Sequence, residues 1–200
     1  MVLNGPLGNL TAETETDEPR LAERRWAARL AAGDQTAFDE LVRAHRDRVT
    51  RLASRLLGWP DEVDDVVQDV FLAAYRSLGR FRGEARIDTW LTTITLNRCR
   101  SVRRWRWLRL RLPRRATPQR EASSGRPDQP AENAELLAEV REAVRHLAQT
   151  DREAIVLRYL EGASVDTIAS LLGVSRGAVE VRLSRARNRL RDVLSPKMEQ

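Results

Sequence analysis

Cysteine, lysine and histidine are nearly missing from this chain of 200 residues. Cys99 is the single cysteine, which excludes an internal disulfide and suits a reducing cytoplasm. The only histidines are His45 and His146, so the residues needed for a Cys/His metal cluster are not there. A phosphate-binding glycine loop is also lacking. We therefore expect no cofactor, no metal and no catalysis by this chain alone.

Long apolar runs are absent as well. None approaches the ~20 residues of a membrane span, and the N-terminus lacks a basic segment followed by an apolar core. No stretch shows the two-residue alternation of a strand, whereas apolar residues recur at helical spacing along most of the chain. The sequence predicts an all-α, cytoplasmic protein without membrane insertion.

Charge is abundant but unevenly distributed. The net charge is +6, yet residues 61–69 hold five acids and no base, while residues 98–120 hold ten arginines and no acid. This asymmetry indicates a polyanionic partner for one part of the chain and a different partner for another.

Residues 162–190, GASVDTIASLLGVSRGAVEVRLSRARNRL, carry the most specific pattern. Gly173 separates two short amphipathic helices, and Ser175 is placed to cap the second. The inward stripe of that second helix is Val179, Leu183, Ala186 and Leu190. Its other faces carry Arg176, Arg182, Arg185, Arg187, Arg189 and Arg191, with Glu180 as the only acid among them. The pattern favours a DNA-binding helix-turn-helix over a helical hairpin with a solvated basic face.

A cleanly amphipathic helix is predicted to begin at Asp61. Its apolar face is formed by Val66, Val67, Val70, Phe71, Ala74, Tyr75 and Leu78. On the other side Asp61, Asp65 and Asp69 stack at i, i+4, where like charges repel slightly. These residues alone leave a solvated face and a docking surface equally open.

The next segment combines arginines with aromatic residues. A loop is expected over Leu78–Arg86, followed by a helix from about Ile87. Trp90 fits a core position, whereas Trp105 and Trp107 sit in an arginine-rich run that is hard to bury. Aromatic rings interleaved with arginines suit single-stranded nucleic acid, because bases stack on the rings and arginines hold phosphates.

Composition divides the chain into four parts. Residues 1–16 read as a disordered tail, 17–111 as a first helical domain, 112–133 as a flexible Pro/Ser/Gly/Gln-rich linker, and 134–195 as a second helical domain. Helix breaks are predicted at Gly33-Asp34 and at Gly58-Trp59-Pro60. In the second domain, Thr150 and Glu153 fit a capping box, and the helix they begin carries Ile155, Val156 and Tyr159.

The combination resembles the bacterial RNA polymerase sigma factors of the extracytoplasmic-function (ECF) type. The first domain is similar through AFDELVRAHRDRV, DEVDDVVQDVFLAAYRSLGRF and TWLTTITLNRCRSVRR. The second is similar from ENAELLAEVREAVRHLAQTDREAIVLRYLEG through the helix-turn-helix. The resemblance implies a subunit that binds core polymerase, recognises −10 and −35 promoter elements and promotes melting of the duplex.

The resemblance also implies roles for particular residues. The acidic helix would dock on the β′ clamp helices of core polymerase through Asp64, Asp65, Gln68, Asp69 and Phe71. The −10 element would be captured and melted by Phe81, Arg82, Trp90, Asn97, Arg98 and Arg100. The −35 element would be read in the major groove by Ser175, Arg176, Glu180, Arg182 and Arg185. Relatives commonly have a basic residue at the position of Glu180. We expect the Glu180 carboxylate either to pair with Arg176 on the same helix or to accept a hydrogen bond from a cytosine amine.

Implied partners are promoter DNA, the β′ and β subunits of core polymerase, and an anti-sigma factor that clamps both domains. The main alternative is a helix-turn-helix regulator that acts without core polymerase. That alternative leaves the acidic helix and the basic-aromatic helix without a role. A protein-only adaptor would not need the arginines of the second helix.

Overall fold

The computed structural model describes residues 25–30, 32–78, 81, 86–111 and 131–198. Within these ranges every regular element is helical and there is no strand, which confirms the predicted all-α class. The predicted tail, and the linker apart from its last residues, lie outside the described residues.

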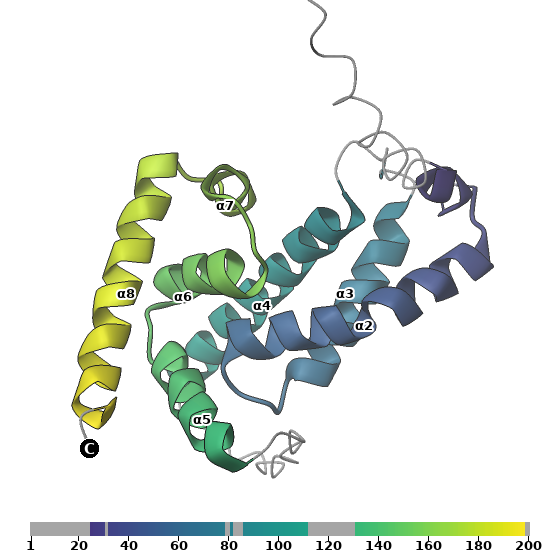
Figure 1. Cartoon of the computed structure of the whole chain (residues 1–200). Coiled ribbons are helices and arrows are strands. Elements are labelled where there is room, and N and C mark those ends of the chain that lie inside the picture. Colours follow the sequence, from purple (N-terminus) through teal and green to yellow (C-terminus); the bar gives the residue numbers. More distant parts are fainter. Residues whose placement is uncertain (1–24, 31, 79–80, 82–85, 112–130, 199–200) are drawn as a thin grey trace, which may run out of the picture.

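Helices α2 (Gln35–Leu57), α3 (Val63–Ser77) and α4 (Ile87–Arg111) pack pairwise against one another and form the N-terminal bundle (Figure 1). A short helix over residues 25–30 precedes them. The bundle is held by apolar side chains that recur every three or four residues and are almost fully buried. They include Leu41, Leu52, Val66, Val70 and Leu91.

The predicted breaks on either side of α2 are confirmed. Asp34 precedes the helix and its carboxylate accepts hydrogen bonds from the backbone amides of Thr36 and Ala37, at 3.0 and 3.2 Å. Gly58 follows the helix with φ of 80°, a left-handed conformation that L side chains rarely adopt. Both ends of α2 are therefore set by local chemistry.

Two details of α3 differ from the sequence prediction. The helix begins at Val63, because residues 61 and 62 form a turn, so Asp64 and Asp65 lie in its first turn, where acids favour the helix dipole. Tyr75 is 51 % exposed instead of buried. Its ring meets the edge of Phe38 from α2 with centroids 5.1 Å apart, outside the core.

The C-terminal bundle consists of α5 (Ala131–Arg145), α6 (Gln149–Ile155), α7 (Val165–Leu172) and α8 (Arg176–Met198), with a π-helical turn η2 (Val156–Leu160) after α6. Helix α5 begins inside the stretch assigned to the linker from composition, which ended at residue 133. Helices α5, α6 and α7 all pack against α8.

The capping box predicted at the start of α6 was wrong. The helix already begins at Gln149, and its N-cap Ala148 receives no side-chain hydrogen bond. Glu153 is drawn away from the helix end because it binds Arg100 of α4. Of the three apolar residues named for this helix, Ile155 and Val156 are buried, whereas Tyr159 is 56 % exposed on η2, where the helix widens to the π form.

The helix-turn-helix of α7 and α8 is confirmed. Ser164 caps α7 through the amide of Thr167, Gly173 ends it with φ of 66°, and Ser175 accepts from the amide of Ala178 at 3.2 Å. The inward stripe of α8 is buried at Val179, Leu183 and Ala186. Helix α8 is thus fixed against α7, and its arginines apart from the half-buried Arg182 are exposed.

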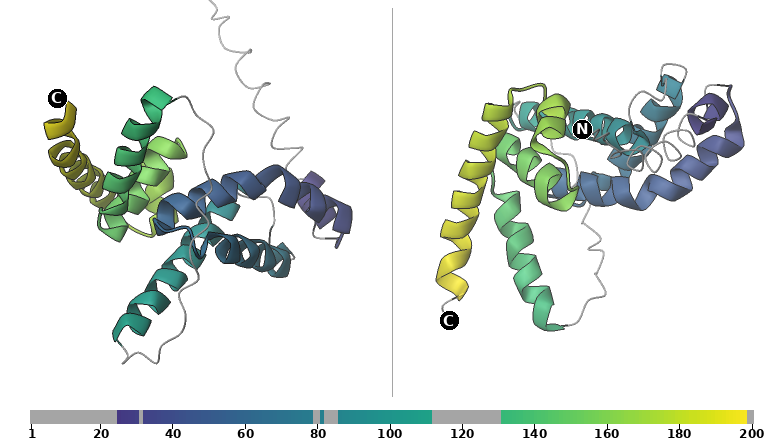
Figure 2. Two further views of the ribbon diagram at one scale, coloured as in Figure 1. Left: turned by 90° about the horizontal axis from the view of Figure 1, so that it is seen from below. Right: turned by 45° about the horizontal axis from the view of Figure 1, so that its top comes forward.

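The two bundles lie against each other instead of apart. Helix α2 contacts α5, α6 and η2, and the views in Figures 1 and 2 show the C-terminal bundle seated at the end of α2. Buried apolar residues of both bundles form one continuous cluster. The interface between them has consequences for the candidate sites.

Candidate polymerase and nucleic-acid interfaces

The acidic face of α3 is fully open to solvent. Asp64, Asp65, Gln68 and Asp69 are all exposed, because the opposite face supplies the valines of the core. Phe71 was predicted to join this surface, but it is only 8 % exposed and packs inside the N-terminal bundle. It supports the acidic face from within and offers no contact area of its own.

Apolar area is nevertheless available beside the acids. Leu72 is 44 % exposed on the same helix, close in sequence to the 51 % exposed Tyr75. Sequence reasoning did not select Leu72, since its neighbour Phe71 was the more obvious hydrophobic residue. A surface of carboxylates next to exposed apolar side chains is typical of a protein–protein interface.

Phe81 and Trp90 form a stacked pair. Their ring centroids are 4.7 Å apart with planes tilted by 33°, and Phe81 is only 7 % exposed. Phe81 is predicted as a direct DNA contact, but its ring is buried against Trp90 of α4. Arg82, predicted for the same site, lies outside the described residues.

Helix α4 carries the remaining residues predicted for single-stranded DNA. Asn97 is exposed and Arg98 is half-buried. Arg100 is already engaged, since its Nε and Nη2 donate to the two carboxylate oxygens of Glu153 at 3.0 and 2.7 Å. This hydrogen bonding raises the pKa of Arg100. The arginine predicted for promoter DNA thus holds a carboxylate from the other bundle.

A cation–aromatic cluster lies at the turn between α2 and α3. The guanidinium carbons of Arg103 and Arg106 lie 5.1 and 4.5 Å from the ring centroid of Trp59. Trp59 Nε1 also donates to Glu62 at 2.6 Å. From the sequence Trp59 is predicted only as part of a helix break, because its two arginine partners are more than forty positions away.

The two tryptophans near the end of α4 are exposed, as the arginine-rich run predicted. Trp105 is 63 % and Trp107 is 52 % exposed. Arg109 covers one face of Trp105 at 5.2 Å from the centroid. Large rings on a basic helix surface can stack with bases.

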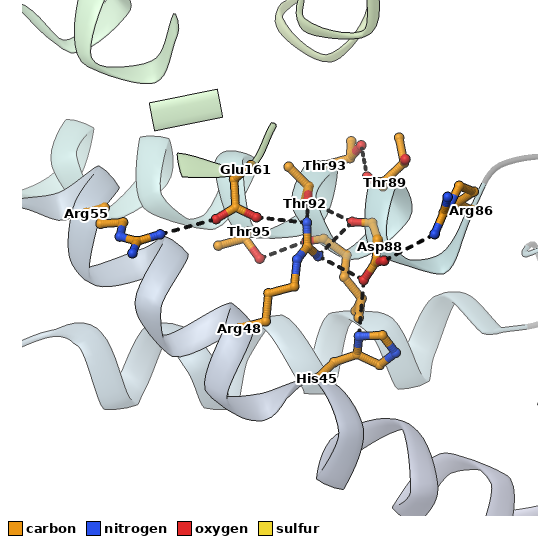
Figure 3. A network of polar contacts seen from close by, with 11 residues as sticks. His45, Arg48, Arg55, Arg86, Asp88, Thr89, Thr92, Thr93, Thr95 and Glu161 are labelled. Atoms are coloured by element: carbon orange, nitrogen blue, oxygen red, sulfur yellow. Dashed lines mark hydrogen bonds and ion pairs between the residues drawn. The ribbon is translucent and has the colours of Figure 1, made fainter. Parts of the chain in front are cut away.

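Figure 3 shows a second polar network where α2, α4 and η2 approach one another. Arg48 of α2 donates to the carbonyl oxygen of Asp88 and to Thr92 Oγ1 of α4, at 3.2 and 3.1 Å. The same guanidinium pairs with Glu161 at 2.9 Å. His45 lies 3.3 Å from the Asp88 carboxylate, and burial lowers the pKa of its imidazole.

The recognition helix α8 presents its arginines in a braced form. Arg176 binds both carboxylate oxygens of Asp166 at 3.1 Å and Glu180 at 3.3 Å. The intrahelical pair between Arg176 and Glu180 foreseen from the sequence is therefore formed. Arg185 pairs with Asp151 at 2.9 Å, whereas Arg182 is half-buried.

The described part of the chain holds no group of three or more His, Cys, Asp or Glu placed to bind a metal ion. None of its helices is long and apolar enough to cross a membrane.

Comparisons with known proteins agree with both bundles. The family model for Sigma-70 region 2 matches residues 41–109, and that for Sigma-70, region 4 matches residues 137–190. The RNA polymerase sigma factor NccH of Alcaligenes xylosoxydans xylosoxydans is 38 % identical over 84 % of this chain and 92 % of its own length. The chain belongs to the ECF-type RNA polymerase sigma factors.

A second relative of the ECF family is the ECF sigma factor SigE of Mycolicibacterium smegmatis, 36 % identical over 82 % of this chain. The match spans only 65 % of that longer relative. Among solved structures, CnrH in complex with the cytosolic domain of CnrY has a TM-score of 0.64 at 34 % identity, covering 88 % of this chain and 98 % of CnrH. The sigma factor RpoE of Bartonella quintana, in complex with the anti-sigma factor NepR, has a TM-score of 0.62 at 26 % identity, covering 79 % and 96 %.

Proposed function

We propose that this ECF sigma factor binds core RNA polymerase, directs it to promoters with −10 and −35 elements, and helps to open the duplex. The observation that carries the proposal is the separation of charge in the fold. One exposed acidic face lies on α3, while exposed arginines lie on α4 and α8. A polymerase contact and two DNA contacts therefore have separate surfaces on one chain.

Core polymerase docks on the acidic face of α3. Asp65, Gln68 and Asp69 supply charge and hydrogen-bond acceptors, and Asp64 extends the surface in the first turn of the helix. The exposed side chains of Leu72 and Tyr75 add apolar contact area. The partner surface is the clamp helices of the β′ subunit, with the β subunit contacting the C-terminal bundle.

The −10 element is held in single-stranded form along α4. Asn97, Arg98 and Arg100 bind phosphates and base edges, and Phe81 packs on Trp90 in the first turn of α4. Melting is favoured because the chain binds the separated strand more tightly than the duplex. The contacts made only with the separated strand offset the unpairing cost of a few kcal/mol. The exposed Trp105 and Trp107 extend this surface with stacking area.

The −35 element is read by α8 in the major groove. Ser175 fixes the start of the helix, and Arg182 and Arg185 reach phosphates or guanine edges. Arg176 is braced by Asp166 and Glu180, so it enters the groove in a fixed orientation.

An anti-sigma factor is the natural regulatory partner of this chain in the cytoplasm. Support comes from the Bartonella quintana neighbour, which was solved with its anti-sigma factor. Pull-down with the tagged full-length chain from cells of its own source, followed by mass spectrometry, tests for such a protein. A specific partner is expected in uninduced cells. Less of it should be recovered from cells grown under conditions in which the target promoters are active.

Run-off transcription with core polymerase and a pool of genomic promoters tests the function itself. Discrete start sites that depend on the added chain are expected, and Asp69→Arg should abolish them. Glu142→Arg serves as the matched control, because Glu142 is a half-exposed acid on α5. If the chain alone shifts duplex DNA but supports no start site, it is a helix-turn-helix regulator and the proposed function is wrong.

A further inference from the structure

Three charged residues of the C-terminal bundle are buried where it meets the N-terminal bundle. Arg152 and Glu153 of α6 are 3 % and 4 % exposed, and the side chain of Glu161 after η2 is 8 % exposed. Charged side chains are seldom buried unless they are paired. Each of the three has at least one partner in the N-terminal bundle, and Arg152 also donates to the carbonyl oxygens of Arg145 and Leu147 in its own bundle.

Arg152 is inserted at the C-terminal end of α2. Its Nη1 donates to the carbonyl oxygens of Leu56 and Leu57 at 3.3 and 3.0 Å, and Arg103 of α4 donates to the same two oxygens. The end of a helix carries partial negative charge, so two guanidinium groups gather there.

This contact also carries a cost. Burial, with Arg103 and Arg145 nearby, lowers the pKa of Arg152 to about 10. Its buried Nε has no hydrogen-bond partner among the described residues. An unsatisfied buried donor and two adjacent cations weaken the interface, which suits a contact that opens.

Glu153 joins the two bundles through Arg100, which is proposed above to bind DNA. Its carboxylate forms a two-pronged pair with Arg100, the geometry in which arginine also binds phosphate. Gln149 donates to the same carboxylate at 3.0 Å. While this pair is formed, the Nε–Nη2 edge of Arg100 is taken and cannot bind a phosphate of the promoter strand.

Glu161 makes a second anchor at some distance along α2. It pairs with Arg48 at 2.9 Å and with Arg55 at 3.6 Å, as Figure 3 shows. Arg48 is itself fixed by Asp88 and Thr92. The C-terminal bundle is therefore held by carboxylates on two separate arginine sites.

Resting on the proposed function, we propose that this interface is an inhibitory latch in which the Glu153 carboxylate stands in for a promoter phosphate on Arg100. The free chain is closed, and Arg100 binds DNA only after the C-terminal bundle has moved away. Opening restores water to both members of each ion pair, and the DNA phosphates then replace the carboxylate. The affinity of the free chain for DNA is reduced by the fraction of molecules that are closed.

Distances between spin labels in the full-length chain test the closed state. Ser54→Cys on α2 and Ser184→Cys on α8 place labels on exposed positions of the two bundles, while the native Cys99 is 2 % exposed and stays unlabelled. One narrow distance is expected for the free chain. Glu153→Gln and Glu161→Gln should each add a longer, broader population. Glu142→Gln, which removes the same charge from exposed α5, should not.

Binding of a fluorescent single-stranded oligonucleotide of mixed sequence tests the competition. If about a tenth of the free chain is open, Glu153→Gln should raise the affinity up to about tenfold over Glu142→Gln. Arg100→Gln should also open the chain but lower the affinity. Opposite effects from the two members of one ion pair are not expected of a bond that only stabilises the fold.

The proposal is overturned if Glu153→Gln leaves either the label distance or the affinity at the level of Glu142→Gln. Circular dichroism checks folding, and if Glu153→Gln does not fold, Glu161→Gln takes both measurements, because its partners are not proposed DNA contacts. The proposed function fails in a different way. In that case no variant supports start sites with core polymerase, while the label distances of the free chain are unaffected.

Discussion

Arg152 of α6 donates a hydrogen bond of 3.0 Å to the carbonyl oxygen of Leu57, the last residue of α2. The next residue is Gly58, whose φ of 80° turns the chain toward α3. A Cβ at Gly58 would lie 2.8 Å from Nη1 of Arg152 and 3.0 Å from Cγ of Arg145. Gly58 therefore ends α2 and, because it lacks a Cβ, leaves room for Arg152 and Arg145 of the C-terminal bundle.

Gly58→Ala should destabilise the chain more than Gly33→Ala. Both glycines have positive φ, which costs alanine about 1–2 kcal/mol, but a Cβ at Gly33 meets nothing within 4 Å. The added crowding at Gly58 should cost about 1–3 kcal/mol more, measured by urea unfolding. Equal losses for the two variants would mean that the bundles do not meet at Gly58 in solution.

Asp34 should make the chain sensitive to acid. Hydrogen bonds from Thr36, Arg29 and Ala37 lower the pKa of its carboxyl from 3.8 to about 2. A lowered folded pKa means that the stabilisation is complete above pH 3.8 and is lost as the pH falls toward 2. Unfolding curves across this range should show a step that Asp34→Asn removes. A step of the same size in Asp34→Asn would assign it to another carboxyl.

Features that depend on neighbouring residues could be predicted from the sequence, and features that depend on distant residues could not. Asp34, Gly58 and Ser175 were assigned correctly, because a cap or a positive φ is decided within a few residues. Glu153 was misassigned as a helix cap, since its partner Arg100 is 53 positions away. The spacing of neighbouring residues does not indicate an ion pair between residues so far apart in the sequence.

The candidate sites show the same division. The exposed acids of α3 follow from the helical period, and so does the buried stripe of α8. Phe71 and Phe81 are predicted at binding surfaces, but both are buried. The sequence does not distinguish an apolar residue that packs in the core from one that contacts a partner when it lies beside a functional motif. Tyr75 was wrong in the other direction, because it falls on the apolar stripe of α3 and is nevertheless 51 % exposed.

Cys99 should be unreactive in the folded chain. It is 2 % exposed, and burial raises the pKa of its thiol to about 12. Because the thiolate is the reacting form, iodoacetamide at neutral pH should modify the native chain far more slowly than the urea-unfolded chain. Rapid native labelling, followed by mass spectrometry, would contradict this and would point to a redox role for Cys99.

Glu180 should influence which base is read at the −35 element. It braces Arg176 at 3.3 Å from the next turn of α8. Glu180→Gln weakens that brace, so selection of promoters from a randomised pool should change at one or two base pairs, each worth about 1–3 kcal/mol. Arg187→Ala, on an exposed part of the same helix, should weaken all promoters alike. An unchanged preference in Glu180→Gln would remove Glu180 from base recognition.

This chain is expected to direct transcription only when it is bound to core polymerase. The most direct measurement is run-off transcription from a genomic promoter pool with core polymerase, comparing the wild-type chain with Asp65→Arg and with the control Glu142→Arg. Discrete start sites are predicted with wild type and with Glu142→Arg, and none with Asp65→Arg. Start sites that survive Asp65→Arg, or that fail to appear with wild type while the chain alone shifts duplex DNA, would contradict the account.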